Sequence, residues 1–219
     1  MSLWHPSTVL AATLLVPALA CAAPYSGEAA SPPAPAQAPG WAYSATGMYY
    51  VPTDESNFLL VIATADRGSL HLEARYNYEA LDTASLFAGW KFSGGDALTY
   101  ELTPILGAVF GATQGIAPGF EASLAYGMVD YYIEAEYLYD LDVKEDSYTY
   151  AWSELGFGPV KWLRFGLVGQ RTRVYNTDRA IQGGGFVQFI LGKTTLGFYV
   201  FNPGDSADQL AIVSLAAEF

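Results

Sequence analysis

The sequence predicts an all-β fold, an antiparallel transmembrane β-barrel of about 12 strands with up-and-down topology. First, apolar and polar residues alternate from residue 41 onward in runs of roughly 9–11 residues, the length of a tilted membrane strand. Second, hydrophobic residues make up 52% of the chain and charged residues 15%. Yet no segment after the N-terminal region has the ~20 consecutive apolar residues that a membrane helix needs. Third, 16 Tyr and 5 Trp suit a fold that holds amphipathic rings at two water–lipid boundaries.

The N-terminal part of the chain has a different composition from the rest. Residues 1–22 are predicted to be a signal peptide, because a short apolar run ends in small residues suited to peptidase cleavage. Residues 23–40 are rich in Pro and Ala and predict an extended or disordered linker. Cys21 is the only cysteine, and it is either acylated or removed with the signal peptide. The barrel is therefore assigned to residues 41–219.

Each alternating run is interpreted as one strand, and turn residues separate the runs. The predicted strands are 41–51, 57–65, 69–79, 83–93, 97–111, 118–126, 128–139, 147–157, 161–173, 181–191, 194–202 and 209–219. An even number is required of a closed bacterial barrel whose termini lie on one side of the membrane. Pro104 interrupts the fifth run and predicts a kink or bulge, since proline cannot donate to a strand ladder. Tight turns such as 66–68 alternate with longer acidic segments such as 140–146.

The last strand carries a second kind of information. It reads QLAIVSLAAEF, with Val213, Leu215 and the terminal Phe219 on its apolar side. This strand resembles the C-terminal strand of Gram-negative outer-membrane β-barrel proteins, which serves that class as its assembly signal. The resemblance implies an outer-membrane location with both termini in the periplasm. It also implies contact with outer-membrane lipid, lipopolysaccharide and the barrel-assembly machinery.

The same alternation predicts aromatic residues at both rims of the barrel. The extracellular rim is expected to hold Tyr49, Tyr50, Tyr76, Tyr78, Tyr137, Tyr139, Tyr148, Tyr150 and Tyr175. The periplasmic rim is expected to hold Trp41, Tyr43, Trp90, Tyr100, Tyr126, Tyr131, Phe157, Trp162 and Phe219. For the eighth and ninth strands the sequence leaves open which alternate residues face inward.

The polar side of the strands predicts the lining of the barrel, in which acids outnumber bases. The predicted lumen residues are His71, Glu73, Arg75, Lys91, Glu101, Glu121, Glu134, Glu136 and Arg164. Such a lining suits a small porin-like passive channel that favours cations, with small solutes or ions as its ligands. Alternatively, the carboxylates pair with the bases and plug a structural or surface-interaction barrel that transports nothing. The net charge of −12 argues against a nucleic-acid partner, whose phosphates it would repel.

Catalysis and metal binding have weaker support in the sequence. Ser69, His71 and Glu73 share one face of a strand and resemble the Ser and His of outer-membrane lipid hydrolases. However, the i and i+2 positions lie ~6.6 Å apart along a strand, and this triplet points inward, away from lipid. We therefore expect no enzyme, with a lipid hydrolase as the remaining alternative. No cofactor is expected, and a single His after residue 22 argues against an ordinary zinc site.

Overall fold

The computed structural model describes residues 40–53, 55–174, 180–206 and 208–219. The predicted signal peptide, linker and Tyr175 lie outside these ranges. The elements are β1 (Ala42–Pro52), β2 (Phe58–Arg67), β3 (Leu70–Tyr76), β4 (Thr83–Trp90), β5 (Phe92–Gly94), β6 (Leu98–Gly111), β7 (Gly115–Tyr126), β8 (Val129–Asp140), η1 (Lys144–Asp146), β9 (Tyr148–Val160), β10 (Leu163–Val174), β11 (Ala180–Leu191), β12 (Thr194–Phe201) and β13 (Leu210–Glu218). Within the described ranges, no helix is long and apolar enough to cross a membrane.

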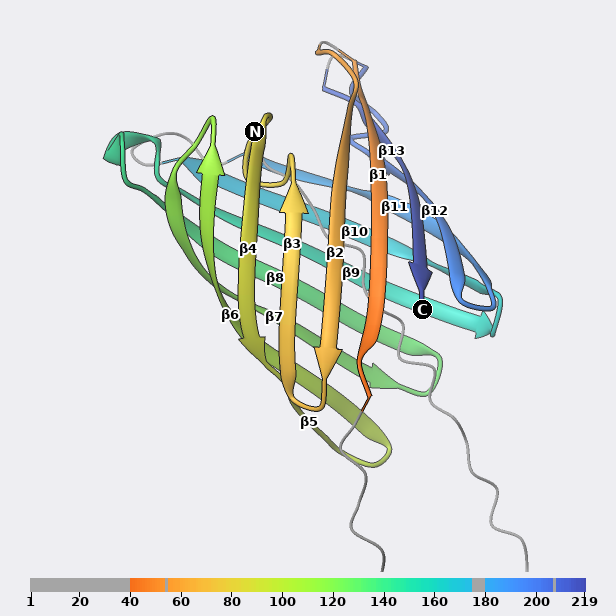
Figure 1. Cartoon of the computed structure of the whole chain (residues 1–219). Coiled ribbons are helices and arrows are strands. Elements are labelled where there is room, and N and C mark those ends of the chain that lie inside the picture. Colours follow the sequence, from red (N-terminus) through yellow and green to blue (C-terminus); the bar gives the residue numbers. More distant parts are fainter. Residues whose placement is uncertain (1–39, 54, 175–179, 207) are drawn as a thin grey trace, which may run out of the picture.

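The strands form one closed antiparallel barrel, as predicted (Figure 1). Strands that are neighbours in sequence pair with each other, and β1 pairs with β13 to close the sheet. The backbone N–H of Phe219 also donates to the carbonyl of Tyr43 at 2.9 Å. Closure leaves no free sheet edge, so every strand can satisfy its backbone groups within the membrane.

The segments β4 and β5 are one strand of the barrel, interrupted opposite Pro104. Gly89 pairs with Ile105 before the interruption, and Phe92 pairs with Leu102 after it, in the same register. Pro104 lacks the N–H that the ladder needs at this point. The predicted kink or bulge is therefore a gap in the hydrogen bonding without a register shift, and the barrel has 12 strands.

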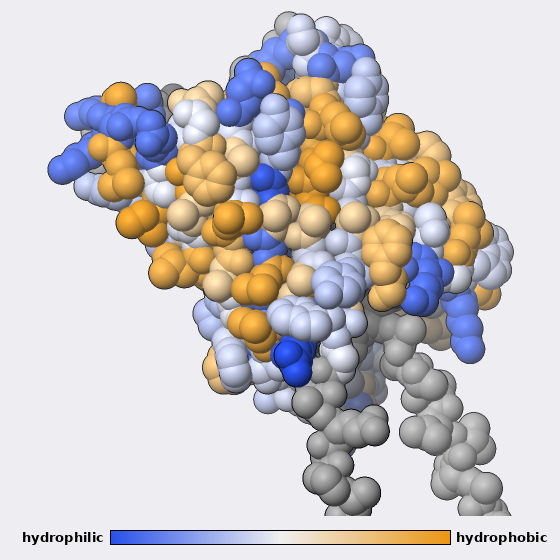
Figure 2. All heavy atoms as spheres, viewed as in Figure 1, coloured by the Kyte–Doolittle hydropathy of each residue, from blue (hydrophilic) through white to orange (hydrophobic). Residues whose placement is uncertain are grey.

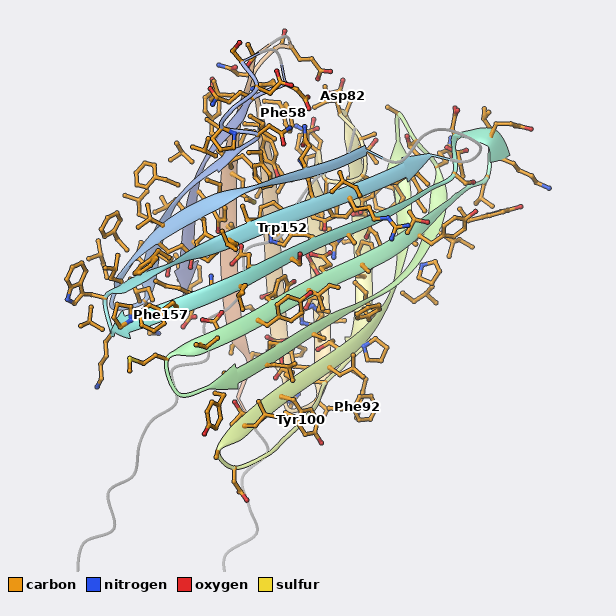
Figure 3. The ribbon with its side chains drawn as sticks, turned by 180° about the vertical axis from the view of Figure 1, so that it is seen from behind. Phe58, Asp82, Phe92, Tyr100, Trp152 and Phe157 are labelled. Atoms are coloured by element: carbon orange, nitrogen blue, oxygen red, sulfur yellow. The ribbon has the colours of Figure 1, made fainter. Side chains whose placement is uncertain are left out.

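The two ends of the barrel differ in their connections. At one end, which we call the tight-turn end, two-residue turns join β2 to β3, β7 to β8, β9 to β10 and β11 to β12. Gly68, Gly127 and Gly192 adopt positive φ in three of these turns, a conformation that other residues rarely adopt. At the opposite end, the loop end, most connections are longer. Figure 3 shows Phe92 and Tyr100 at the tight-turn end, with Phe58 and Asp82 at the loop end.

The outer surface of the barrel is apolar. Figure 2 shows hydrophobic residues over the middle of one face and hydrophilic residues at the top and lower edges. Among the exposed side chains are Leu59, Leu86, Leu106, Leu167, Ile181, Leu191, Val213 and Leu215. An apolar surface of this extent matches the lipid-facing band of a membrane barrel. Exposed aromatic residues also gather at the tight-turn end, as predicted for Trp41, Tyr43, Trp90, Tyr100, Tyr126, Phe157, Trp162 and Phe219. Tyr131, the ninth residue predicted for this rim, is only partly exposed.

The predicted aromatic rim at the loop end is partly wrong. Tyr49, Tyr76, Tyr137 and Tyr139 are exposed, but Tyr50, Tyr78, Tyr148 and Tyr150 are buried inside the barrel. In β1 and β9 the reason is parity, since neighbouring residues on a strand face opposite sides. Tyr78 is inside because β3 ends at Tyr76, so the strand alternation no longer applies in the connection to β4, where Tyr78 and Glu79 are both buried.

A candidate functional site in the barrel interior

The centre of the barrel interior is a cluster of three carboxylates around one guanidinium, here called the Arg75 cluster. Arg75 Nε donates to Glu73 Oε1 at 2.7 Å, and Arg75 Nη1 donates to Glu136 Oε2 at 3.0 Å. Its Nη2 lies 2.8 Å from Glu134 Oε1. All four side chains are buried. Because β3 and β8 supply these residues, the cluster joins opposite walls of the barrel.

Two aromatic rings enclose the same guanidinium. Arg75 Cζ lies 4.0 Å from the centroid of the Tyr78 ring and 4.1 Å from that of Phe87. The Tyr78 hydroxyl donates to Glu134 Oε1 at 2.6 Å. The rings cover the faces of the guanidinium while the carboxylates occupy its edges, so the buried charge is surrounded by protein groups that stabilise it. The loop side chain Tyr78 thus completes a cluster that the strands begin.

The adjacent loop residue, Glu79, is also buried. Its Oε1 accepts from the Ser85 hydroxyl at 2.6 Å, and its backbone carbonyl accepts from the Tyr148 hydroxyl at 2.6 Å. Its Oε2 has no hydrogen-bond partner among the described residues. Burial raises the pKa of Glu79 above its ordinary value of 4.5, although nearby Arg75 acts in the opposite direction.

This raised pKa predicts a pH-dependent stability. The folded protein binds the Glu79 proton more tightly than the unfolded chain does, so ionisation of Glu79 weakens folding as pH rises above about 4.5. We expect Glu79→Gln to gain stability relative to the parent between about pH 4 and about pH 8. Urea unfolding in lipid vesicles at both pH values measures it. Glu145→Gln, at an exposed position of η1, is the control, and an equal change there would contradict the assignment.

A second ion pair network, built around the buried side chains of Arg164 and Glu154, lies on β8–β11. Arg164 donates to both oxygens of Asp130, to Glu154 Oε2 at 2.5 Å and to Gln188 Oε1 at 3.0 Å. Its guanidinium carbon lies 4.7 Å from the centroid of the Phe186 ring. The network has the same design as the Arg75 cluster, with an arginine between carboxylates and an aromatic face.

Beside these networks and toward the loop end, large side chains fill the interior. Trp152 is fully buried and packs against Tyr199 and Phe201, with ring centroids 5.6 and 5.5 Å apart. Figure 3 shows Trp152 midway along the barrel. The other fully buried large side chains are Tyr50, Tyr78, Tyr150, Met48, Leu60, Ile62, Leu138 and Ile212. These side chains have almost no solvent-accessible surface, so they pack against one another and fill much of the interior at this level.

Toward the tight-turn end the interior is polar and open to water. Lys91 Nζ lies 2.7 Å from Asp66 Oδ2 and 3.9 Å from Glu101 Oε1, and these side chains are 21–26% exposed. His71 Nδ1 contacts Asp66 Oδ1 at 2.8 Å. We call this group, Asp66, His71, Lys91 and Glu101, the vestibule.

The predicted catalytic triplet does not have the geometry of a nucleophile and its base. Both ring nitrogens of His71 contact carboxylates, Nδ1 with Asp66 and Nε2 with Glu73 Oε2 at 3.4 Å. Neither nitrogen is therefore directed at the Ser69 hydroxyl. Ser69 itself lies in the turn between β2 and β3, and Glu73 belongs to the Arg75 cluster.

The structure divides the predicted lumen residues into groups. Glu73, Arg75, Glu134 and Glu136 form the Arg75 cluster, Arg164 forms the second network, and His71, Lys91 and Glu101 lie in the vestibule. Glu121 lies close to His71 and Glu73. Sequence reasoning missed the interior roles of Asp66, Tyr78, Glu79 and Trp152. Continuing the inward alternation of Leu60, Ile62 and Thr64 would have reached Asp66, but nothing in the sequence indicates that Tyr78 and Glu79, in the loop after β3, are buried in the interior.

The comparisons with known proteins bear on the fold of the barrel. No protein-family model matches the chain, and no curated protein matches it. Among solved structures, the barrel is similar to the KdgM porin, with a TM-score of 0.62, 9% identity, and coverage of 80% of this chain and 99% of that one. The NanC porin matches with a TM-score of 0.56, 9% identity and coverage of 80% and 98%. This chain has the porin fold.

A third similar structure is the KdgM porin in complex with disordered oligogalacturonate, with a TM-score of 0.61, 8% identity and coverage of 80% and 99%. At such identities the likeness establishes the fold alone. It confirms the prediction of an outer-membrane type of β-barrel with about 12 strands. The porin fold surrounds an interior that here contains two buried arginine networks and a filled central layer.

Proposed function

We propose that this protein is a porin-like channel for small cations that rests in a closed state. It resides in the outer membrane of a Gram-negative bacterium, with both termini in the periplasm and the loop end outside. The observation that carries the proposal is the charge of the interior, where carboxylates outnumber basic side chains among the described residues. The interior carboxylates include Asp66, Glu73, Glu101, Glu121, Asp130, Glu134, Glu136 and Glu154, and the basic groups are His71, Arg75, Lys91 and Arg164.

This charge decides which solutes the barrel favours. Acidic groups along a narrow path attract cations and replace part of their hydration shell. Oligogalacturonate, the ligand in one similar porin structure, is an anionic sugar and would be repelled by the same groups. The vestibule supplies the water-accessible part of this path, because its carboxylates are partly exposed.

The closure is made by side chains, so a change in a few of them can open it. The Arg75 cluster spans from β3 to β8. Tyr78, in the loop between β3 and β4, stabilises the cluster through its hydrogen bond to Glu134. Neither group belongs to a separate plug domain. Displacing Tyr78 removes the ring that covers one face of the Arg75 guanidinium, and it removes one hydrogen bond to Glu134.

Tyr78→Ala is therefore expected to increase ion flow. In planar bilayers we expect the parent to show rare, small openings and the variant to show a several-fold larger mean current. A KCl gradient should give a reversal potential of the sign expected for cation selectivity. Tyr76→Ala is the matched control, because Tyr76 lies two residues away and is 47% exposed on the outer surface. A current that is anion-selective, or equal in both variants, would contradict the proposal.

The second candidate function is a permanently plugged structural or surface-interaction barrel. The complete burial of Trp152, Glu134 and Glu154 favours it. Its distinguishing result is the absence of current in the parent and in Tyr78→Ala at every voltage, with both proteins folded. In neither proposal is the protein an enzyme. The roles of Val213, Leu215 and Phe219 in assembly, and contacts with lipopolysaccharide, remain part of the proposal.

A further inference from the structure

One group of side chains, at the point where the vestibule meets the Arg75 cluster, has the composition of a metal site. His71 and Glu73 on β3 and Glu121 on β7 each offer a ligand atom, and these atoms all lie within 4.8 Å of one another. We propose that this group binds one divalent transition-metal ion, with Zn²⁺ as a suitable occupant. The inference goes beyond the channel function and does not depend on it.

The orientation of His71 supports this assignment. Its Nδ1 contacts Asp66 Oδ1 at 2.8 Å, which leaves Nε2 facing Glu73 and the interior. In protein metal sites, a carboxylate on one ring nitrogen commonly fixes the histidine so that the other nitrogen can bind the metal. Asp66 has the position of such an orienting carboxylate, and it comes from a third strand, β2.

The carboxylate of Glu73 has an oxygen suited to the ion. Its Oε1 is held by Arg75 Nε at 2.7 Å, and its Oε2 lies 3.2 Å from Arg75 Nη2 and 3.4 Å from His71 Nε2. Oε2 is therefore on the side of the carboxylate that faces the histidine nitrogen, where the ion would lie. Glu121 is partly exposed, and the neighbouring vestibule is accessible to water, so an ion can enter from the tight-turn end.

The donor set indicates the class of ion. One imidazole nitrogen and two carboxylate oxygens suit first-row divalent ions, and Zn²⁺ binds such mixed sites more tightly than Mn²⁺ does. Ca²⁺ and Mg²⁺ prefer oxygen ligands alone. A sequence with one histidine in its barrel argues against a site built from histidine and cysteine. Here the barrel brings carboxylates from β3 and β7 to that one histidine.

Titration calorimetry of the full-length protein with ZnCl₂ in nanodiscs tests the proposal. We expect one Zn²⁺ per chain in the barrel, not displaced by a roughly hundredfold excess of Mg²⁺. Glu121→Gln and His71→Gln are each expected to weaken binding at least ~10-fold, as is typical when a ligand or its orienting partner is lost. The matched control is Glu101→Gln, which removes the same charge from the vestibule and leaves the three ligands in place.

Each outcome decides the question once circular dichroism shows that the variant is folded. Failure of the parent to bind Zn²⁺ overturns the proposal without any variant. Equal weakening by Glu101→Gln and Glu121→Gln shows diffuse attraction by the vestibule, and overturns it too. Binding that is unchanged in both Glu121→Gln and His71→Gln places the ion elsewhere on the chain and also overturns the proposal. Selective loss in those two variants supports the site.

Discussion

Arg75→Met is expected to lower the free energy of unfolding by about 3–5 kcal/mol, the cost of leaving buried charges without their partner. Three buried carboxylates, Glu73, Glu134 and Glu136, point at this one guanidinium. Methionine fills much of the same volume, so the loss comes from charge more than from packing. The change in the urea midpoint in lipid vesicles, followed by tryptophan fluorescence, measures it.

Lys91→Met is the control for the Arg75 experiment. Lys91 also pairs with carboxylates, but its side chain is 21% exposed, and water screens a partly exposed pair. We expect a change of at most about 1 kcal/mol. Adding Glu134→Gln to Arg75→Met should restore part of the stability, because one buried negative charge disappears. If Arg75→Met cost no more than Lys91→Met, the Arg75 cluster would not be the organising contact of the interior.

Trp152→Ala is expected to cost about 3–5 kcal/mol, as is typical for a fully buried tryptophan replaced by alanine. The change opens a cavity beside Tyr199 and Phe201 and removes the hydrogen bond from Nε1 to Glu154 Oε1 at 3.2 Å. Both effects act in the same direction. Urea unfolding of folded protein in vesicles measures the loss.

Trp162→Ala provides the comparison for Trp152. Trp162 lies in the turn between β9 and β10 and is 54% exposed, so its truncation leaves no internal cavity. Its cost should be clearly smaller. A cost equal to that of Trp152→Ala would mean that the central layer is less tightly packed than the structure indicates. A marked increase in ion current through Trp152→Ala, measured without added Zn²⁺, would further show that the buried side chains around Trp152 close the path.

The strands were predictable because the information for each is local. A residue such as Leu86 or Leu106 faces lipid, and its neighbours face inward, whatever the rest of the chain does. The predicted strand bounds were least accurate where the alternation of apolar and polar residues stops. Strand β3 stops at Tyr76, three residues before the predicted end, and β7 starts at Gly115, three residues before the predicted start.

The grouping of the interior residues was not predictable in the same way. The sequence indicated that Arg75, Glu134 and Glu136 face the lumen, but Arg75 and Glu136 are 61 residues apart. The signal for Tyr78 was misleading, because it continues the alternation of the strand and yet lies in a loop. Contacts with Arg75, Glu134 and Tyr150, which exist only in the folded barrel, explain why its ring turns inward.

The sequence by itself therefore determined the barrel, its strands, its apolar outer surface and the acidic character of its interior. The tertiary structure decided that Arg75 holds three glutamates, that Trp152 fills the centre, and that Glu121 comes close to His71 and Glu73. The physical reason is that alternation along a strand is set by neighbouring residues. Pairing across the interior exists only after β1 meets β13 and the closed wall brings distant side chains within hydrogen-bond distance.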